Sequence, residues 1–178
     1  MNRPGTKAIL SIAIVVMLIA AAAYLIGSTS SSQCASSASG VSAATPQITT
    51  TQSVPSNFTL NGRTFNITYV ATNNTEWQSG LMDKKVTNST FMLFVFPSLA
   101  VYPFWMYHVN SSLDIIWLHV AGDSGCVVYL AADVPGCTGL SIVCPNYTPS
   151  STANYVIEAK GGFAASNGVR VGTTVQFG

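Results

Sequence analysis

From Phe58 onwards, apolar residues occur in short runs separated by residues that favour turns. Residues 91–96 form one continuous apolar run, and Pro97 ends it. Residues 63–69 instead alternate polar and apolar side chains, as a half-buried strand does. The Asn61-Gly62 pair before them is a strong signal for a two-residue hairpin turn. Many short strands with turn signals predict an all-β domain, a compact antiparallel sandwich or barrel.

The remaining elements follow from similar signals. One short helix is expected from the Asn73 cap, which Glu76 follows at the capping-box spacing, to about Ser79, and Gly80 ends it. Residues 131–152 contain three prolines and are expected to form a long loop. Further strands are expected at 104–109, 113–119, 126–130, 154–159 and 173–177.

Six short blocks follow one another along the chain: Gly80-Leu81-Met82, 91–96, Phe104-Trp105-Met106, 113–116, 155–158 and 172–175. In residues and order they resemble the domain of unknown function 192 family, over about residues 58–178. The resemblance implies a small β domain but no activity, since the family has no settled one. The family typically has Lys-Asn-Thr after Met106, where this chain has Tyr107, His108 and Val109. Any family chemistry of those side chains is therefore expected to be lost or changed here.

Residues 8–26 form an apolar run without a charged residue. As a helix this run would be about 28 Å long, close to the thickness of a bilayer core. Arg3 and Lys7 precede the run and no base follows until Arg63, so the N-terminus is expected in the cytoplasm and the rest outside. We therefore expect a single-pass cell-membrane protein, bound to the membrane through residues 8–26. The alternative is a secreted protein whose N-terminal segment is a cleaved signal peptide.

These features divide the chain into three parts. Residues 1–27 are the expected membrane anchor, formed by a single N-terminal transmembrane helix. Residues 28–56 consist mostly of Ser, Thr, Ala, Gln and Gly, without apolar periodicity, and are expected to be a flexible stalk. Residues 57–178 are the expected extracytoplasmic β domain.

Charged residues make up only 7% of the chain, against about 25% in a typical soluble domain. Because the chain has no basic stripe, nucleic acid is not an expected partner. Asn-x-Ser/Thr sequons supply another route to solubility, and all of them follow the apolar run: Asn57, Asn66, Asn73, Asn88, Asn110 and Asn146. These asparagines are candidates for glycosylation of an extracytoplasmic domain. The alternative is a polar coat that carries no glycans.

The chain has four cysteines, which can oxidise outside the cytoplasm. Cys137 and Cys144 bracket a turn in the expected long loop, and secreted members of the resembled family often carry a similar pair there. The resemblance therefore implies a Cys137–Cys144 disulfide. Cys126 is expected in a strand as a buried free thiol, and Cys34 lies in the stalk, where it could link two chains. A Cys34–Cys126 bridge is the alternative.

The segments around Trp105 and Asp114 are the best candidates for a binding site. If residues 104–109 form a strand, Phe104, Met106 and His108 share one face. Asp114 is a carboxylate in an otherwise apolar strand, and a buried carboxylate needs partners. Either Asp114 pins the 110–113 turn by hydrogen bonds, or it forms the floor of a small pocket with Trp105 and Met82 as walls. The candidate binding residues are Met82, Trp105, Met106, His108 and Asp114.

No metal centre, cofactor or catalytic residue is expected, because neither a Cys-x-x-Cys pair nor a catalytic motif occurs. Copper(I) is an alternative, since thioethers and imidazoles are ligands that suit it. The side chains concerned are Met82, Met92, Met106, His108 and His119.

The resulting hypothesis is a membrane-anchored extracytoplasmic module that binds a small ligand or a surface protein. One alternative is a hydrolase or carbohydrate-active accessory enzyme that uses Asp114 with His108 or Glu158, the latter expected to be half-buried. Another is a structural surface glycoprotein. The sequence names neither the ligand nor the partner.

Overall fold

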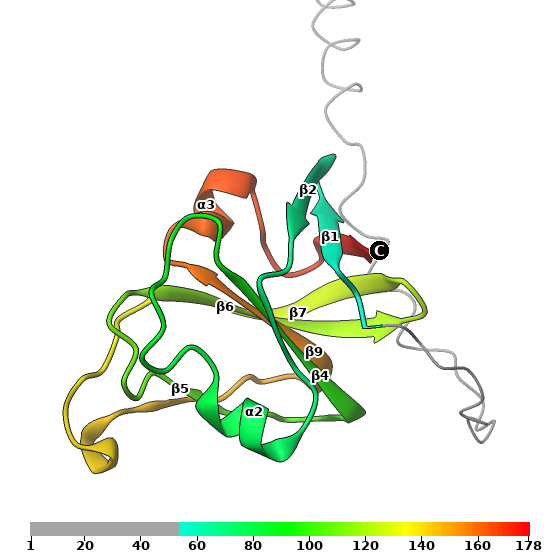
Figure 1. Ribbon diagram of the computed structural model, residues 1–178. Helices are drawn as coiled ribbons and strands as arrows, with labels where there is room; N and C mark the ends of the chain where they lie inside the picture. Colours follow the sequence, from blue (N-terminus) through cyan, green and yellow to red (C-terminus); the bar gives the residue numbers. More distant parts are fainter. Residues whose placement is uncertain (1–53) are drawn as a thin grey trace, which may run out of the picture. The chain divides into compact units, whose positions relative to one another are not determined.

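The computed structural model describes residues 54–178 (Figure 1). The expected anchor and all but the last residues of the expected stalk lie outside the described residues. Within residues 54–178, no helix combines the length and the apolar composition needed to cross a membrane.

The described residues form a mostly-β domain with short helices. The strands are β1 (Asn57–Leu60), β2 (Arg63–Asn66), β3 (Tyr69–Ala71), β4 (Phe91–Ala100), β5 (Phe104–Trp105), β6 (Leu113–Ala121), β7 (Ser124–Val134), β8 (Asn146–Tyr147), β9 (Ala153–Lys160) and β10 (Thr174–Phe177). Two short α-helices, α2 (Asn74–Ser79) and α3 (Phe163–Asn167), and the 3₁₀ turn η2 (Ser141–Val143) complete the domain.

Eight strands form one curled sheet in the order β2-β1-β10-β7-β6-β9-β4-β3, and β5 pairs with β8 in a separate two-stranded ribbon (Figure 1). The edge strands β2 and β3 are consecutive in the chain, so residues 67 and 68 connect the two edges of the sheet. The expected antiparallel pairing holds except at one edge, where β3 and β4 are parallel.

Three adjacent strands of this sheet, β6, β9 and β4, are buried on both faces. Along β6, Ile116, Leu118 and Val120 belong to one hydrophobic cluster, which we call the inner cluster. The alternate residues Ile115 and Trp117 belong to a second, outer cluster. Burial on both faces explains why residues 91–96 read as a continuous apolar run rather than an alternating one.

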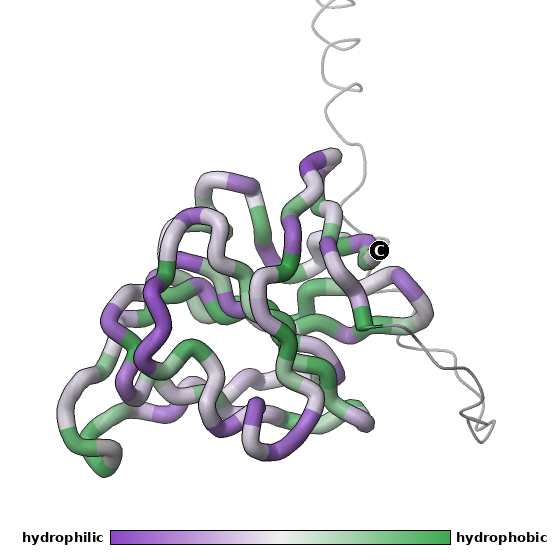
Figure 2. Tube along the Cα trace, viewed as in Figure 1, coloured by the Kyte–Doolittle hydropathy of each residue, from purple (hydrophilic) through white to green (hydrophobic). Residues whose placement is uncertain are grey.

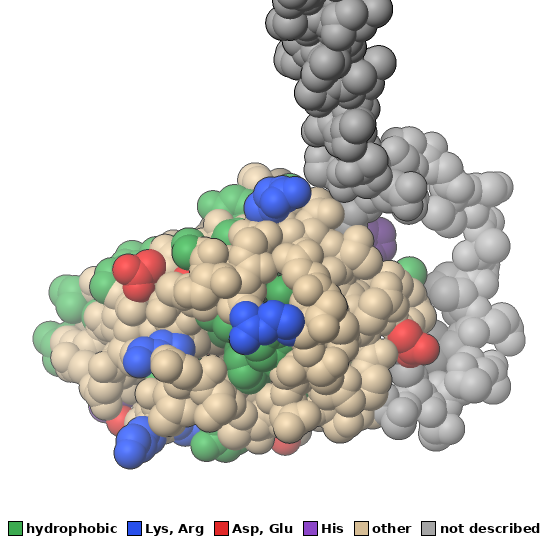
Figure 3. All heavy atoms as spheres, turned by 90° about the horizontal axis from the view of Figure 1, so that it is seen from above, with side chains coloured by type: hydrophobic (Ala, Val, Ile, Leu, Met, Phe, Trp, Pro, Cys, Tyr) green, Lys and Arg blue, Asp and Glu red, His purple; other side chains and the backbone are tan. Residues whose placement is uncertain are grey.

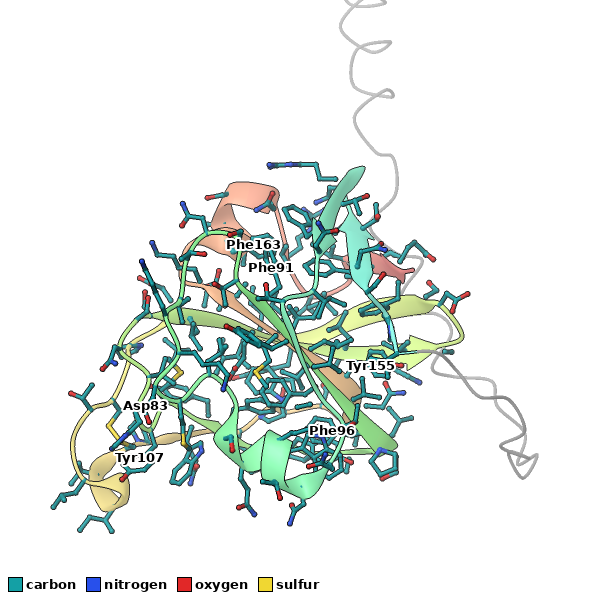
Figure 4. All side chains as sticks on the ribbon, viewed as in Figure 1. Asp83, Phe91, Phe96, Tyr107, Tyr155 and Phe163 are labelled. Atoms are coloured by element: carbon teal, nitrogen blue, oxygen red, sulfur yellow. A yellow bond between two sulfur atoms is a disulfide. The ribbon has the colours of Figure 1, made fainter. Side chains whose placement is uncertain are left out.

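Four phenylalanine rings, from β1, β2, β4 and α3, pack together at one end of the inner cluster. Phe91 and Phe163 lie side by side with ring centroids 5.0 Å apart (Figure 4). Phe58 and Phe65, from the hairpin, complete the group. Every strand of the curled sheet and both clusters lie within residues 57–177, so this part of the chain contains its own core.

Several local predictions are confirmed. Asn61 and Gly62 join β1 and β2, and both have positive φ, as this two-residue turn requires. The side chain of Asn73 accepts a hydrogen bond from the Glu76 amide and caps α2, and Gly80 ends the helix. The carboxylate of Glu76 accepts from the amide of Thr72, one residue before the cap.

Two expected boundaries are wrong, and one helix was not expected. The strand expected at 104–109 ends at Trp105, and His108 has φ +56°. Strand β7 continues through Val134, so the start of the expected long loop is strand. Helix α3 was not expected, because its N-cap is Gly162, which has no side chain to signal a cap.

The structure forms the Cys137–Cys144 disulfide. Replacing both cysteines with serine is expected to lower the free energy of unfolding by about 2.5 kcal/mol, because the unfolded chain regains the freedom of the 137–144 loop. The midpoint of thermal unfolding should fall by several degrees in calorimetry. The double variant is preferable to a reductant because Cys126 is also disulfide-bonded. An unchanged midpoint would show that the bridge contributes nothing to stability.

Candidate functional site

A cleft of about 560 Å³ opens on the outer face of the sheet, between α2 and the β5–β8 ribbon. It falls within the usual range of small-molecule sites, roughly 300–1,000 Å³. Its walls come from α2, β4, the segment before β5, β5 itself and β8. The lining residues are Asn74, Trp77, Gln78, Phe96, Tyr102, Pro103, Phe104, Trp105 and Asn146.

Helix α2 supplies one wall. Trp77 is held by a 3.1 Å hydrogen bond from its Nε1 to the Ala71 carbonyl, and its ring packs against Phe96 at a centroid distance of 5.0 Å. In Figure 4, Phe96 lies beside this helix. Asn74 and Gln78 are four residues apart and exposed, so their amide groups share one side of the helix at the cleft.

Tyr102 forms a second wall and is fixed from three sides. Its ring stacks on Phe96 at 3.7 Å, and its hydroxyl donates to the Ser98 carbonyl at 2.9 Å. Its own carbonyl accepts a 2.9 Å hydrogen bond from Nε1 of the buried Trp117. This wall is therefore preformed rather than mobile.

The β5–β8 ribbon supplies the third wall. Trp105 lies across from Asn146, and Phe104 lies across from Tyr147. Phe104 is buried in the outer cluster, whereas Trp105 is 37% exposed. The exposed ring of Trp105 and the amide of Asn146 therefore border the same cleft.

The chemistry of the lining is uniform. It combines five aromatic rings with three side-chain amides, and none of the nine residues is charged. Such a surface presents flat apolar faces together with donors and acceptors that carry no net charge. It can therefore hold a neutral molecule that has both apolar and hydrogen-bonding groups.

Of the predicted binding residues, only Trp105 lines this cleft. Met106 is fully buried in the outer cluster, and Met82 is partly buried. The predicted pocket with Asp114 as its floor is wrong, because Asp114 lies on the other face of the sheet, where it contacts Ala164 of the inner cluster. Two amide side chains of the cleft, Asn74 and Gln78, gave no signal in the sequence, and Asn146 was noted only as a sequon.

Asp114 is fully buried and accepts three backbone hydrogen bonds. Its Oδ1 accepts from the amides of Asp133, at 2.6 Å, and Gly162, at 3.4 Å. Its Oδ2 accepts from the amide of Ala164 at 2.6 Å. Asp114 thus caps α3 from strand β6, which is distant in sequence. Asp114 therefore has a structural role, as expected, but it orders the start of α3 and the Asp133 amide rather than the 110–113 turn.

His108 lies apart from Asp114. Its Nδ1 is 3.3 Å from Oδ1 of Asp83, and both side chains are substantially exposed. The Tyr107 ring packs against the imidazole at 4.3 Å, and Figure 4 shows Tyr107 and Asp83 in the same corner of the domain. The predicted pairing of His108 with Asp114 is therefore wrong.

Glu158 is only 3% exposed, so its expected half-burial is wrong. It pairs in register with Ile115, whose side chain belongs to the outer cluster, so Glu158 and Asp114 lie on opposite faces of the sheet. Burial raises the pKa of Glu158 to about 8, although the positive charge of Lys84 acts to lower it. Its Oε2 has no hydrogen-bond partner among the described residues.

The candidate copper ligands are spread over the domain. Met92 and Met106 pack inside the outer cluster, where methionine commonly acts as a filler. His108 contacts Asp83, and His119 lies on β6 across from Cys126. No three His, Cys, Asp or Glu side chains in the part of the chain that the structure describes are grouped to hold a metal ion.

Cys126 is disulfide-bonded, so the expected free thiol at this position is wrong. The predicted roles of Cys34 lie outside the described residues. Five of the sequon asparagines are exposed and Asn57 is partly buried, so their side chains reach the surface of the domain.

Two solved structures have folds similar to this domain. A putative transcription regulator from Sinorhizobium meliloti 1021 has a similar structure, with a TM-score of 0.57, 19% identity, and coverage of 68% of this chain and 90% of the other. A protein of unknown function from Novosphingobium aromaticivorans DSM 12444 gives a TM-score of 0.56, 23% identity, and coverage of 69% and 84%.

At these identities the solved structures show a shared fold and nothing about activity. No curated protein matches the sequence. The model of the family DUF192, described as Uncharacterized ACR, matches residues 57–177, which is more than half of the chain. The chain therefore belongs to the DUF192 family, as its sequence blocks indicated.

Proposed function

We propose that this protein is a membrane-anchored, extracytoplasmic binding module whose cleft holds a small neutral saccharide. The observation that carries the proposal is the composition of the cleft, with five aromatic rings and three amides. The apolar faces of sugar rings stack on aromatic side chains, and their hydroxyl groups pair with amide donors and acceptors. A charged ligand would find no counter-ion among the lining residues.

The placement outside the cell is part of the same proposal. It rests on the apolar run 8–26, the bases Arg3 and Lys7 before it, and the sequons after it. The exposed asparagines of the sequons support a glycosylated surface. Binding is favoured over catalysis because the cleft offers no carboxylate, imidazole or thiol among its lining side chains.

Intrinsic fluorescence provides a direct test. Trp77 and Trp105 line the cleft, whereas Trp117 is buried in the outer cluster. A fragment of residues 28–178, which omits the apolar run and keeps Cys34, would be titrated with cellobiose, maltose and N,N′-diacetylchitobiose. We expect at least one of these disaccharides to change the emission in a saturable way.

Replacing Trp105 with alanine is expected to weaken this binding about tenfold, because one stacking surface is lost. Leu99→Ala, another exposed apolar residue that is not part of the cleft lining, should leave the dissociation constant within about twofold. If no disaccharide binds, or if both variants weaken binding equally, the saccharide site is refuted.

A further inference from the structure

The 137–144 loop ends in an exposed aliphatic tip. Leu140 is 72% exposed, Ile142 is 87% exposed and Val143 is 66% exposed, the three highest values among the large hydrophobic residues of the described chain. Figure 2 shows this tip as a hydrophobic segment at the lower left of the trace. In Figure 3 hydrophobic side chains also appear at the left edge, the side on which this loop lies.

The tip is fixed by a disulfide and by backbone hydrogen bonds. The Cys137–Cys144 disulfide closes the loop, and the Val143 amide donates to the Leu140 carbonyl at 3.0 Å. At the base of the loop, the Cys137 amide donates to the Met106 carbonyl, and the Cys137 carbonyl accepts from the His108 amide at 2.8 Å. Because the loop is already ordered, presenting its aliphatic groups costs little conformational entropy.

The segment that forms the tip carries no charge. No charged residue or histidine occurs between Asp133 and Glu158. Aromatic residues lie at the base of the loop, where Tyr107 forms a bridge with Cys137 and its ring is 5.1 Å from that of Trp105. The exposed pair of His108 and Asp83 lies at the same base, below the aliphatic tip. Tryptophan and tyrosine at the base of an aliphatic tip match the order of a bilayer, with headgroups outside and hydrocarbon inside.

We propose that the tip of the 137–144 loop inserts into a lipid bilayer. The bilayer in question is the one expected to hold the apolar run 8–26, and the inference rests on that expectation rather than on the saccharide site. The 28–56 segment would span roughly 100 Å if fully extended, so the tip can reach the surface of the same membrane. Because the anchor keeps the domain close, even weak insertion would be well populated.

The uncharged, aliphatic tip is suited to a bilayer of neutral lipid. The tip offers three aliphatic side chains and no cation for an anionic headgroup, so insertion should depend on buried apolar area rather than on lipid charge. It should also be insensitive to salt, which screens exposed charges.

The test uses the 28–178 fragment, which keeps both hydrophobic clusters, and extruded phosphatidylcholine vesicles in a flotation assay. We expect the wild type to float with the vesicles and to do so equally in low and high salt. Ile142→Asp should lower the partition coefficient by at least about tenfold, because it removes an apolar side chain and adds a charge. Val171→Asp changes another aliphatic residue that is 61% exposed, outside the loop, and should have an effect below about twofold.

A second measurement detects insertion too weak for the free fragment. The full chain would be reconstituted in phosphatidylcholine vesicles with brominated acyl chains, which quench nearby tryptophan, and Ile142→Asp should reduce the quenching relative to Val171→Asp. The proposal is overturned if both assays show no difference between the two variants. It is also overturned if the wild type forms dimers without lipid and Ile142→Asp abolishes them, because the tip would then be a protein contact.

Discussion

Replacing Asp114 with alanine is expected to lower the free energy of unfolding by about 3–5 kcal/mol, the largest effect of any single substitution considered. The substitution leaves the amides of Asp133, Gly162 and Ala164 without their acceptor. Ala164 is buried, so its unpaired amide costs roughly 1–3 kcal/mol, and the bonds from the exposed residues Asp133 and Gly162 contribute about 0.5–1.5 kcal/mol each. Gly162 provides no side-chain cap that could compensate. Urea denaturation monitored by circular dichroism would measure the loss.

A matched control is Asp123→Ala, because Asp123 is exposed in the hairpin between β6 and β7. It should change stability by less than about 0.5 kcal/mol. Asp114→Asn keeps one oxygen acceptor and should fall between the two. If Asp114→Ala costs less than about 1 kcal/mol, the three hydrogen bonds do not carry the stability assigned to them.

The second large effect is a loss of stability with rising pH, caused by Glu158. Its pKa is about 8 in the folded domain, against an ordinary value of 4.5. Between these values the folded state holds a proton that the unfolded state has released, so stability falls as pH rises. The stabilisation that comes from protonated Glu158 is fully present below pH 4.5 and is lost as the pH rises to about 8. Over this range the free energy of unfolding falls by several kcal/mol.

Glu158→Gln isolates this effect because glutamine has the same size and no carboxyl proton. We expect the variant to be more stable than the wild type at pH 8 and to show a flatter pH profile in urea denaturation. Glu76→Gln is the control: hydrogen bonds from Thr72 lower the pKa of Glu76, so its contribution is lost only as the pH falls through the acid range. Parallel profiles for wild type and Glu158→Gln between pH 5 and 8 would contradict the assignment.

Local signals predicted much of the fold because they act over a few residues. The Asn61-Gly62 turn and the Asn73 cap each depend on side chains close in sequence to the groups they order. Helix α3 could not be predicted in this way, because its cap is Asp114, fifty residues from the Ala164 amide that it accepts. A five-residue helix preceded by two glycines has no local reason to form.

The cleft was harder to predict than the fold. Its aromatic side chains come from several separated segments, and in the sequence each reads as an ordinary core residue. Trp105 was identified because it lies in a recognisable block, but its assumed neighbours depended on a strand that ends before Met106. The assignment of Glu158 failed for a related reason, since only the order of strands in the sheet shows that β9 is covered on both faces.

The shared membership of β4, β6 and β9 in both hydrophobic clusters has a consequence for how the domain opens. If either cluster is disrupted, these three strands also lose their packing against the other cluster. The domain should therefore unfold as one cooperative unit. A ligand held in the outer cleft would then slow amide hydrogen exchange around α3, on the opposite face of the sheet. Ligand binding in the cleft would thus slow local unfolding throughout the domain without any change in the shape of the domain.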